Sequence, residues 1–259
     1  MAGGGHLMDL QLGDRVALVT GSSRGIGLAI AQTLAVEGCR VALNARNHVG
    51  LAAASAQFAG LHSTHPRDVA TEPGAAALVA DVLGRWGRLD ILVCNVGSGA
   101  SVPPGREHEA EWRRCLEVNL LTATNCIAAA RPALAKMTGG AIVCISSICG
   151  LAALGAPVTY SAAKAALNAV VRGLARPLAA EGIRINAIAA GNVLFPGGTW
   201  ARKLEAAPQA VADMLDAEVA MRRLGTPGEI ADVTAFLASP RASFMTGAIV
   251  VADGGQLRA

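Results

Sequence analysis

The chain has 259 residues and a mass of 26.1 kDa, which is enough for one large domain or two small ones. A composition that is 53% hydrophobic and only 16% charged excludes a disordered chain. The 22 basic and 19 acidic side chains leave a net charge of +3, which is too even for the basic surface of a nucleic-acid or anionic-membrane binder. We therefore expect no nucleic-acid partner and no membrane association.

Short β-branched runs alternate along the chain with Ala-rich segments of helical period, the pattern of βαβ units. Strands are predicted at 16–20, 40–44, 61–64, 90–95, 141–146, 183–188 and 248–251. Helices are predicted at 26–37, 49–58, 74–86, 109–136, 159–181, 200–220 and 227–238. These elements predict an α/β fold, a single-domain Rossmann-type doubly wound parallel sheet of about seven strands with helices on both faces.

Three segments depart from this regular pattern. Residues 1–13 are predicted to form a flexible tail. Residues 191–220, polar and punctuated by Gly and Pro, are predicted to form a substrate lid. Its apolar residues either line a pocket or close the lid onto the core: Leu194, Phe195, Trp200 and Met214. Pro177 is expected to kink or weaken the long helix near Gly173, because it removes a backbone donor.

Targeting and metal signals are weak. The N-terminus has no basic start and no uninterrupted apolar stretch before Asp9, so we expect no signal peptide and a cytoplasmic location. The uncharged stretch 137–163 holds several Gly, a Pro and a Tyr, which favours a buried strand plus a loop over a membrane span. The cysteines contain no C-x-x-C pair and favour reduced core thiols, with a metal site or a disulfide as the alternative.

A glycine-rich turn follows the first predicted strand. The stretch from Thr20 to Gly27 reads TGSSRGIG, and the next residues have helical period. Glycines permit a sharp strand-to-helix turn and let backbone N–H groups approach a pyrophosphate at the positive end of the helix. Tight packing alone is the alternative. The candidate cofactor contacts in this turn are Gly21, Ser23, Arg24, Gly25, Ile26 and Gly27.

The end of the second predicted strand bears on which nucleotide would bind. A carboxylate there would hydrogen-bond the ribose 2′-hydroxyl of NAD, but the sequence is Asn44-Ala45-Arg46 and holds no acid. Arg46 and Arg24 would together hold a 2′-phosphate, because guanidinium groups bind phosphate in a forked geometry. We therefore predict NADP(H) in preference to NAD(H); a merely solvated Arg46 is the alternative.

The only tyrosine of the chain, Tyr160, precedes Lys164 by four residues in a predicted helix, so both side chains project from one face. A free phenol has a pKa of about 10 and is a poor base at neutral pH. A neighbouring ammonium would favour the phenolate and bring that pKa towards the working range. We interpret the pair as an acid–base group rather than as a surface Tyr and Lys.

These motifs together resemble the short-chain dehydrogenase/reductase family. The resemblance rests on the glycine turn, on Cys94-Asn95-Val96-Gly97, on Ile145-Ser146-Ser147 and on Tyr160-x-x-x-Lys164, and it spans about residues 12–255. It is closest to the 3-oxoacyl-carrier-protein reductase-like branch. Where that branch often shows carrier-docking arginines this chain has Thr138 and Glu181, which puts a carrier-bound substrate in doubt.

The resemblance implies roles for single residues. Ser147 would hydrogen-bond the substrate carbonyl, Tyr160 would donate the proton, and Lys164 would lower the pKa of Tyr160 and bind the nicotinamide ribose. Asn119 would hold a water in the proton relay. The remaining implied cofactor contacts are Asp68 and Val69 beside the adenine, Asn95 and Gly97 along the floor, and Val193 at the carboxamide.

The resulting prediction is an NADP-dependent oxidoreductase that reduces a ketone, a 3-oxoacyl-type or other small carbonyl compound, to a secondary alcohol. Two alternatives remain open: oxidation of a secondary alcohol, and a catalytically silent dinucleotide-binding protein. An enoyl reductase is disfavoured, because its Tyr and Lys would be more than four residues apart. The resemblance also implies a homotetramer, with a dimer as the alternative.

Overall fold

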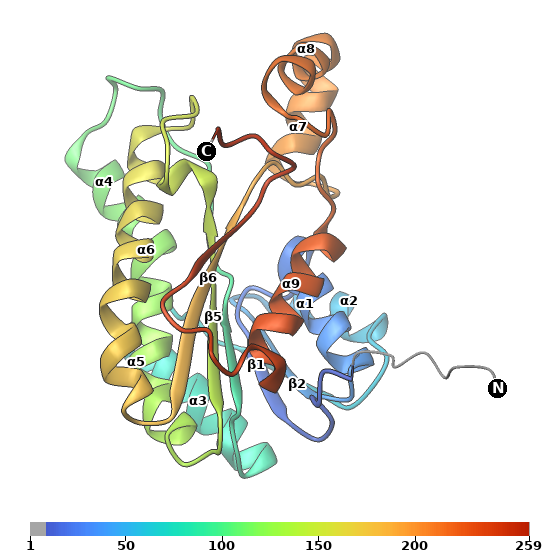
Figure 1. Ribbon diagram of the computed structural model, residues 1–259, viewed down its shortest axis with the longest axis vertical. Helices are drawn as coiled ribbons and strands as arrows, with labels where there is room; N and C mark the ends of the chain where they lie inside the picture. The colour runs from blue at the N-terminus through green and yellow to red at the C-terminus, as the bar shows by residue number, and fades with distance from the viewer. Residues whose placement is uncertain (1–8, 259) are drawn as a thin grey trace, which may run out of the picture.

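The computed structural model describes residues 9–258 and is built on one parallel sheet (Figure 1). Its strands are β1 (Val16–Val19), β2 (Arg40–Ala45), β3 (His62–Pro66), β4 (Ile91–Cys94), β5 (Gly140–Ser147), β6 (Ile183–Ala190) and β7 (Ile249–Ala252). Over the described residues the order is β3-β2-β1-β4-β5-β6-β7, and each neighbouring pair is parallel. The predicted seven-stranded α/β fold is confirmed.

The helices lie on both faces of the sheet (Figure 1). They are α1 (Gly25–Val36), α2 (His48–Ala56), α3 (Glu72–Trp86), α4 (Glu109–Leu116), α5 (Thr122–Leu134), α6 (Val158–Ala179), α7 (Thr199–Ala206), α8 (Pro208–Glu218) and α9 (Pro227–Ala238). Single turns form η1 (Glu117–Leu121, π-helical), η2 (Ile148–Gly150) and η3 (Pro240–Ala242). One core lies under α3, α5 and α6, and the other lies under α1 and α9.

The central strands form because they are continuous apolar runs. All four residues of β1 and of β4 are buried, as are all eight of β5. Strands covered on both faces need no polar alternation, so such runs are typical of a parallel sheet. This two-sided burial holds the carboxyl ends of β1, β4 and β5 rigidly side by side.

The chain reverses its winding direction between β1 and β4. The connection from β1 leads through α1 to β2 on one side, whereas β4 is followed by α4 to α5 and then β5 on the other side. Adjacent strands whose connections diverge leave a crevice at their carboxyl ends, where ligands bind in open α/β sheets. The fold therefore predicts a ligand-binding site among the loops after β1, β4 and β5.

Two predicted helices are divided in the structure. The segment predicted as one helix over 109–136 is α4, the π-helical turn η1 and α5. The segment predicted as one loose helix over 200–220 is α7 and α8, because Ala207 takes a non-helical conformation and Pro208 begins a new helix. Helix α6, in contrast, runs unbroken past Gly173 to Ala179, since Pro177 lies in its last turn.

Other predictions concern the tail, the membrane and the thiols. Residues 1–8 of the predicted tail lie outside the described residues, and Leu12 is buried in the core. Within 9–258 no helix is long and apolar enough to cross a bilayer, and no group of three or more His, Cys, Asp and Glu could hold a metal. All six cysteines are free thiols; Cys149 is half-buried and the other five are buried.

Candidate active site

The turn between β1 and α1 has a backbone that only glycine fits. Gly21 and Gly25 have φ of 63° and 57°, in the left-handed region. A Cβ at Gly27 would lie 2.4 Å from both the Gly21 carbonyl oxygen and Asn95 Nδ2. That amide nitrogen donates to the carbonyls of Thr20 (3.1 Å) and Gly21 (3.0 Å), so the loop after β4 holds the turn in place. The first turn of α1 thus presents its N–H groups to the crevice.

A cleft of about 810 Å³ runs along the carboxyl ends of the strands. At its β2–β3 end it is lined by Arg46, Arg67, Asp68 and Val69, and Arg24 lines it from the neighbouring turn after β1. Arg67 is held by Asp81 in a two-bond ion pair. Arg24 and Arg46 have no ion-pair partner within the described chain. Their positive charges are therefore available to an anion in the cleft.

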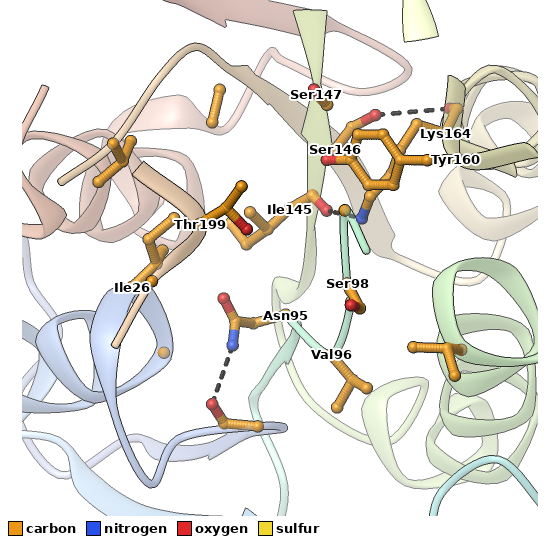
Figure 2. A pocket seen from close by; sticks show the side chains of 18 of the residues that line it. Ile26, Asn95, Val96, Ser98, Ile145, Ser146, Ser147, Tyr160, Lys164 and Thr199 are labelled. Atoms are coloured by element: carbon orange, nitrogen blue, oxygen red, sulfur yellow. Dashed lines mark hydrogen bonds between the residues drawn. The ribbon is translucent and has the colours of Figure 1, made fainter. Parts of the chain in front are cut away.

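The chemically reactive side chains gather at the end of β5 (Figure 2). Tyr160 and Lys164 project from the same face of α6, and Ser147 is the last residue of β5. Lys164 Nζ donates to the Ile145 carbonyl oxygen at 2.9 Å and lies 6.0 Å from the centroid of the Tyr160 ring. Ser147, Tyr160 and Lys164 all line the cleft, so the structure brings these three predicted residues together.

The close approach of α6 to this end of β5 has two local causes. A Cβ at Gly150 would lie 2.7 Å from the Lys164 carbonyl carbon, so only glycine lets η2 pack this near the helix. Ser146 Oγ donates to Asn168 Oδ1 at 2.6 Å, and Asn168 Nδ2 donates to the Gly150 carbonyl at 3.3 Å. Buried polar contacts of this kind fix the helix in one position against the strand.

Burial dominates the electrostatics of the Tyr160–Lys164 pair. Burial raises the pKa of Tyr160 from its ordinary 10.0 to about 12, although a hydrogen-bonding interaction with Ser147 opposes the rise. Burial also lowers the pKa of Lys164 from 10.5 to about 8. Lys164 is not among the causes of the rise at Tyr160, and its ammonium donates to a backbone carbonyl, so the predicted lowering of the phenol pKa by Lys164 stays a prediction. With a pKa of about 12, the phenol is protonated at neutral pH.

Asn119 lies in the π-helical turn η1 behind this group. Its Oδ1 accepts from Ser98 N at 2.8 Å, and its Nδ2 donates to the carbonyls of Ser98 and Cys115, both at 3.1 Å. A Cβ on Gly97 would lie 3.0 Å from Asn119 Oδ1 and 3.1 Å from Lys164 Nζ, so both side chains pack against Gly97. The side-chain amide thus fixes the loop after β4 and does not itself line the cleft.

Part of the segment 191–220, which the sequence predicts to be a lid, packs on the glycine turn. A Cβ on Gly25 would lie 2.7 Å from the Phe195 ring, which shows that the ring packs directly on the turn. Val193 lines the cleft and forms a parallel bridge with Gly225. Arg202 on α7 donates to the Gly197 carbonyl at 3.0 Å, and a Cβ on Gly197 would lie 3.3 Å from Arg24 Nη1. Arg202 and Arg24 therefore both lie near Gly197, which places a second guanidinium group close to the glycine turn.

Of the predicted site residues, only Gly25 and Asn119 do not line the cleft, and each packs directly behind its wall. Sequence reasoning missed several lining residues: Val96, Ser98, Ile145, Leu154, Asn192, Thr199, Arg202, Glu218 and Gln256. Some carry a positional signal, because Val96, Ser98 and Asn192 directly follow the ends of β4 and β6. Ile145 lies near the carboxyl end of β5, and Leu154 lies in the loop between η2 and α6. The others come from residues 191–220 and from the C-terminal segment, where position along the chain gives no such signal.

The charge of the lining fits a nucleotide with several phosphates. Six cations line the cleft (Arg24, Arg46, Arg67, Lys164, Arg202 and Lys203), against two carboxylates, Asp68 and Glu218. The glycine turn, which also lines the cleft, supplies backbone donors. A nicotinamide dinucleotide, an elongated anion with a neutral or cationic ring at one end, fits the size and charge of the cleft.

A doubly wound parallel sheet with a glycine turn at its switch point defines a dinucleotide-binding α/β protein. Residues 21–256 match the protein family described as enoyl-(acyl carrier protein) reductase. The chain belongs to the short-chain dehydrogenase/reductase family, in its 3-oxoacyl-carrier-protein reductase-like branch.

Curated relatives cover nearly the whole chain. It is 37% identical to cis-4-hydroxycyclohexanecarboxylate dehydrogenase of Sinomonas cyclohexanicum, over 93% of this chain and 96% of that protein. It is 32% identical to 3-oxoacyl-(acyl-carrier-protein) reductase FabG of Staphylococcus aureus, over 92% of this chain and 96% of that protein. The chain is thus similar to oxidoreductases of alcohols and ketones.

Solved structures agree with the fold. A 7α-hydroxysteroid dehydrogenase complexed with NADH and 7-oxo glycochenodeoxycholic acid has a TM-score of 0.88 and 31% identity, with 97% of each chain covered. L-sorbose reductase from Gluconobacter frateurii, complexed with NADPH and L-sorbose, also has a TM-score of 0.88 and 31% identity, over 97% of this chain and 100% of that chain. Structural neighbours of the chain therefore bind nicotinamide dinucleotides of both kinds.

Proposed function

We propose that the protein is an NADPH-dependent reductase that converts a ketone to a secondary alcohol. The observation that carries the proposal is the meeting of Ser147, Tyr160 and Lys164 in one cleft with a glycine turn that fits a pyrophosphate. The dinucleotide supplies the hydride when bound. What the chain must supply is a place for the carbonyl, stabilisation of the charge that develops on its oxygen, and a proton.

The three side chains divide these tasks. The Ser147 hydroxyl donates to the carbonyl oxygen and positions it, and Tyr160 Oη delivers the proton to the same oxygen. Burial raises the pKa of Tyr160 to about 12, which keeps the phenol protonated and therefore a donor. Lys164, held by the Ile145 carbonyl, places a positive charge behind the phenol, where it lowers the cost of the phenolate left after proton transfer. Asn119 acts on this group through the loop after β4, and its predicted relay water stays a prediction.

The choice of NADP(H) over NAD(H) rests on charge at the β2 end of the cleft. Arg24 and Arg46 line it without ion-pair partners among residues 9–258, and β2 ends in Ala45 rather than in an acid. A 2′-phosphate would meet two guanidinium groups, whereas a ribose 2′-hydroxyl would find no carboxylate from β2. The adenine would lie beside Asp68 and Val69.

Two neighbouring activities are less well supported. Alcohol oxidation uses the same residues in reverse, but a phenol with a raised pKa favours the acid role. The matched family carries the description of an enoyl reductase; the one-turn spacing of Tyr160 and Lys164 and relatives named as dehydrogenases and a 3-oxoacyl reductase favour a carbonyl substrate. We further propose a homotetramer, which would elute at four times the chain mass in size-exclusion chromatography with light scattering.

The proposal is tested by NADPH consumption with a panel of β-ketoesters, cyclic ketones and quinones. We expect ketone-dependent turnover, its loss in Tyr160→Phe, and retention of NADPH binding in that variant. Turnover by Tyr160→Phe would show that the acid has been misassigned. Arg46→Ala should weaken NADPH binding about tenfold or more and leave NADH binding nearly unchanged; equal effects on both would remove the role given to Arg46.

A further inference from the structure

The cleft extends past the reactive group towards β6 and β7. Because the strand order is β3-β2-β1-β4-β5-β6-β7, the glycine turn and the arginines lie at one end, Tyr160 lies beside β5, and residues after β6 and β7 lie beyond it. If the dinucleotide occupies the first part, as the proposed function requires, the β6–β7 end holds the part of the substrate distant from its carbonyl. This inference rests on that function.

The β6–β7 end contains an ordered chain of polar side chains. Asn192 Nδ2 donates to Gln256 Oε1 at 2.9 Å, and Gln256 Nε2 is directed to Glu218 Oε2 at 3.4 Å. Gln256 is only 7% exposed, so its amide is fixed with the NH₂ group towards the carboxylate. Glu218 Oε1 has no donor among the described residues. The chain therefore ends in an acceptor that is free to bind a ligand.

Glu218 is exposed and does not stabilise its own helix. It is the last residue of α8, where the helix dipole disfavours a negative charge, and the last turn of α8 has no basic residue. One turn earlier on the same face lies Met214, which also lines the cleft. Helix α8 thus contributes one apolar side chain, Met214, and one carboxylate, Glu218, to the cleft.

Glu218 also lines an adjoining pocket of about 470 Å³, together with Leu154, Gly155, Gln256 and Arg258. Arg258 is the one cation on this pocket among residues 9–258, and it forms no ion pair with Glu218. The two pockets share Leu154, Gly155, Glu218 and Gln256. The carboxylate therefore stands where a substrate would pass from the main cleft into the side pocket.

We infer that Glu218, oriented by Gln256, is a specificity-determining residue that selects ketones with hydrogen-bond donors at their distal end, either hydroxyl or ammonium groups. A carboxylate side chain can only accept hydrogen bonds, so it binds donors and repels a second carboxylate. Ketones that end in a carboxylate are poor substrates for this site, and plain alkyl ketones gain nothing from Glu218. Discrimination arises from both the attractive and the repulsive term.

Four cyclohexanones that differ only in the substituent at carbon 4 test the inference. The substituents are hydroxy, amino, methyl and carboxylate. The kcat/KM of each ketone is divided by that of the methyl ketone, which gives its relative value. In the wild-type protein we expect the better of the hydroxy and amino ketones to exceed the carboxylate ketone about tenfold or more. Glu218→Gln should raise the relative value of the carboxylate ketone. It should lower that of the amino ketone more than that of the hydroxy ketone, because the Gln carbonyl still accepts a hydrogen bond from either group but no longer attracts the charge of the ammonium.

Asp213→Asn is the matched control, since it removes the same charge from an exposed position on α8 that does not line the cleft. It should leave all ratios unchanged, and a shift equal to that of Glu218→Gln would mean that only the net charge of the lid matters, which overturns the inference. A wild-type preference for the carboxylate ketone that Arg258→Ala abolishes would also overturn it. Reduction of all four ketones without discrimination overturns the inference and leaves the proposed function standing. Reduction of none of the four also overturns the inference, and it overturns the proposed function as well only if the panel of β-ketoesters, cyclic ketones and quinones is not reduced either.

Discussion

Replacing Lys164 with Met should remove a pH-dependent part of the stability of the protein. Lys164 is only 4% exposed, and burial lowers its pKa from 10.5 to about 8. Between these two values the unfolded chain binds a proton that the folded chain lacks, so stability rises with pH. From pH 8 to pH 9.5 this one group should add about 1.6 kcal/mol to the free energy of unfolding, at about 1.36 kcal/mol per unit where the two states differ by a full proton.

The measurement is urea denaturation of the wild type and Lys164→Met at several pH values from 7 to 9.5. The variant also loses the hydrogen bond to the Ile145 carbonyl, but that loss changes little with pH and cancels from the slope of the difference. Lys136→Met, at an exposed position, should give a difference that stays flat over this range. A difference between wild type and Lys164→Met that is also flat would mean that the ammonium is not desolvated, which would refute the reasoning.

Three other predictions concern the glycine turn, a buried ion pair and the phenol. Gly27→Ala should lower the free energy of unfolding by about 1 to 3 kcal/mol and abolish dinucleotide binding, because the added Cβ would lie 2.4 Å from Asn95 Nδ2. Gly173→Ala is the control, since nothing lies within 4 Å of its added Cβ, and it should raise the free energy of unfolding measured in urea by about 0.5 to 1 kcal/mol. Asp90 is 1% exposed and accepts hydrogen bonds from Val16 N and Arg88, so Asp90→Ala should lower the free energy of unfolding by about 3 kcal/mol. Glu109 belongs to an exposed ion pair, and Glu109→Ala should change the free energy of unfolding by less than about 0.5 kcal/mol. Tyr160 is the only tyrosine, so phenolate absorbance should report a midpoint near 12, and a midpoint at or below 10 would show that the phenol is not desolvated.

The fold was predictable because its signals are local and repeated. Buried runs such as those of β1 and β5 are continuous in sequence, and each is followed by a turn and a helix of clear period. The glycine turn was predictable for the same reason, since its conformations exclude other residues whatever surrounds them. The strand order then brought together motifs that lie far apart in the chain.

Other features depend on contacts that the sequence pattern does not carry. The π-helical turn at Asn119 widens a helix whose periodicity predicts an unbroken α-helix over 109–136, and the partner of Asn119 is the backbone of Ser98. The direction of the Tyr160 pKa depends on how deeply the ring is buried and on where the Lys164 ammonium points. Spacing places both side chains on one helical face, but it does not give the depth of burial of either.

The burial of Lys164 is better explained by a functional role than by the stability of the fold. Its side chain is buried with one backbone carbonyl as hydrogen-bond acceptor and with no carboxylate ion-pair partner among residues 9–258. A buried ammonium with so little compensation destabilises the fold, and its lowered pKa expresses that cost. A core position selected for stability alone would hold an apolar residue of similar length. The cost is consistent with the pattern in which reactive groups are held in environments that perturb them, and the pH series on Lys164→Met measures that cost directly.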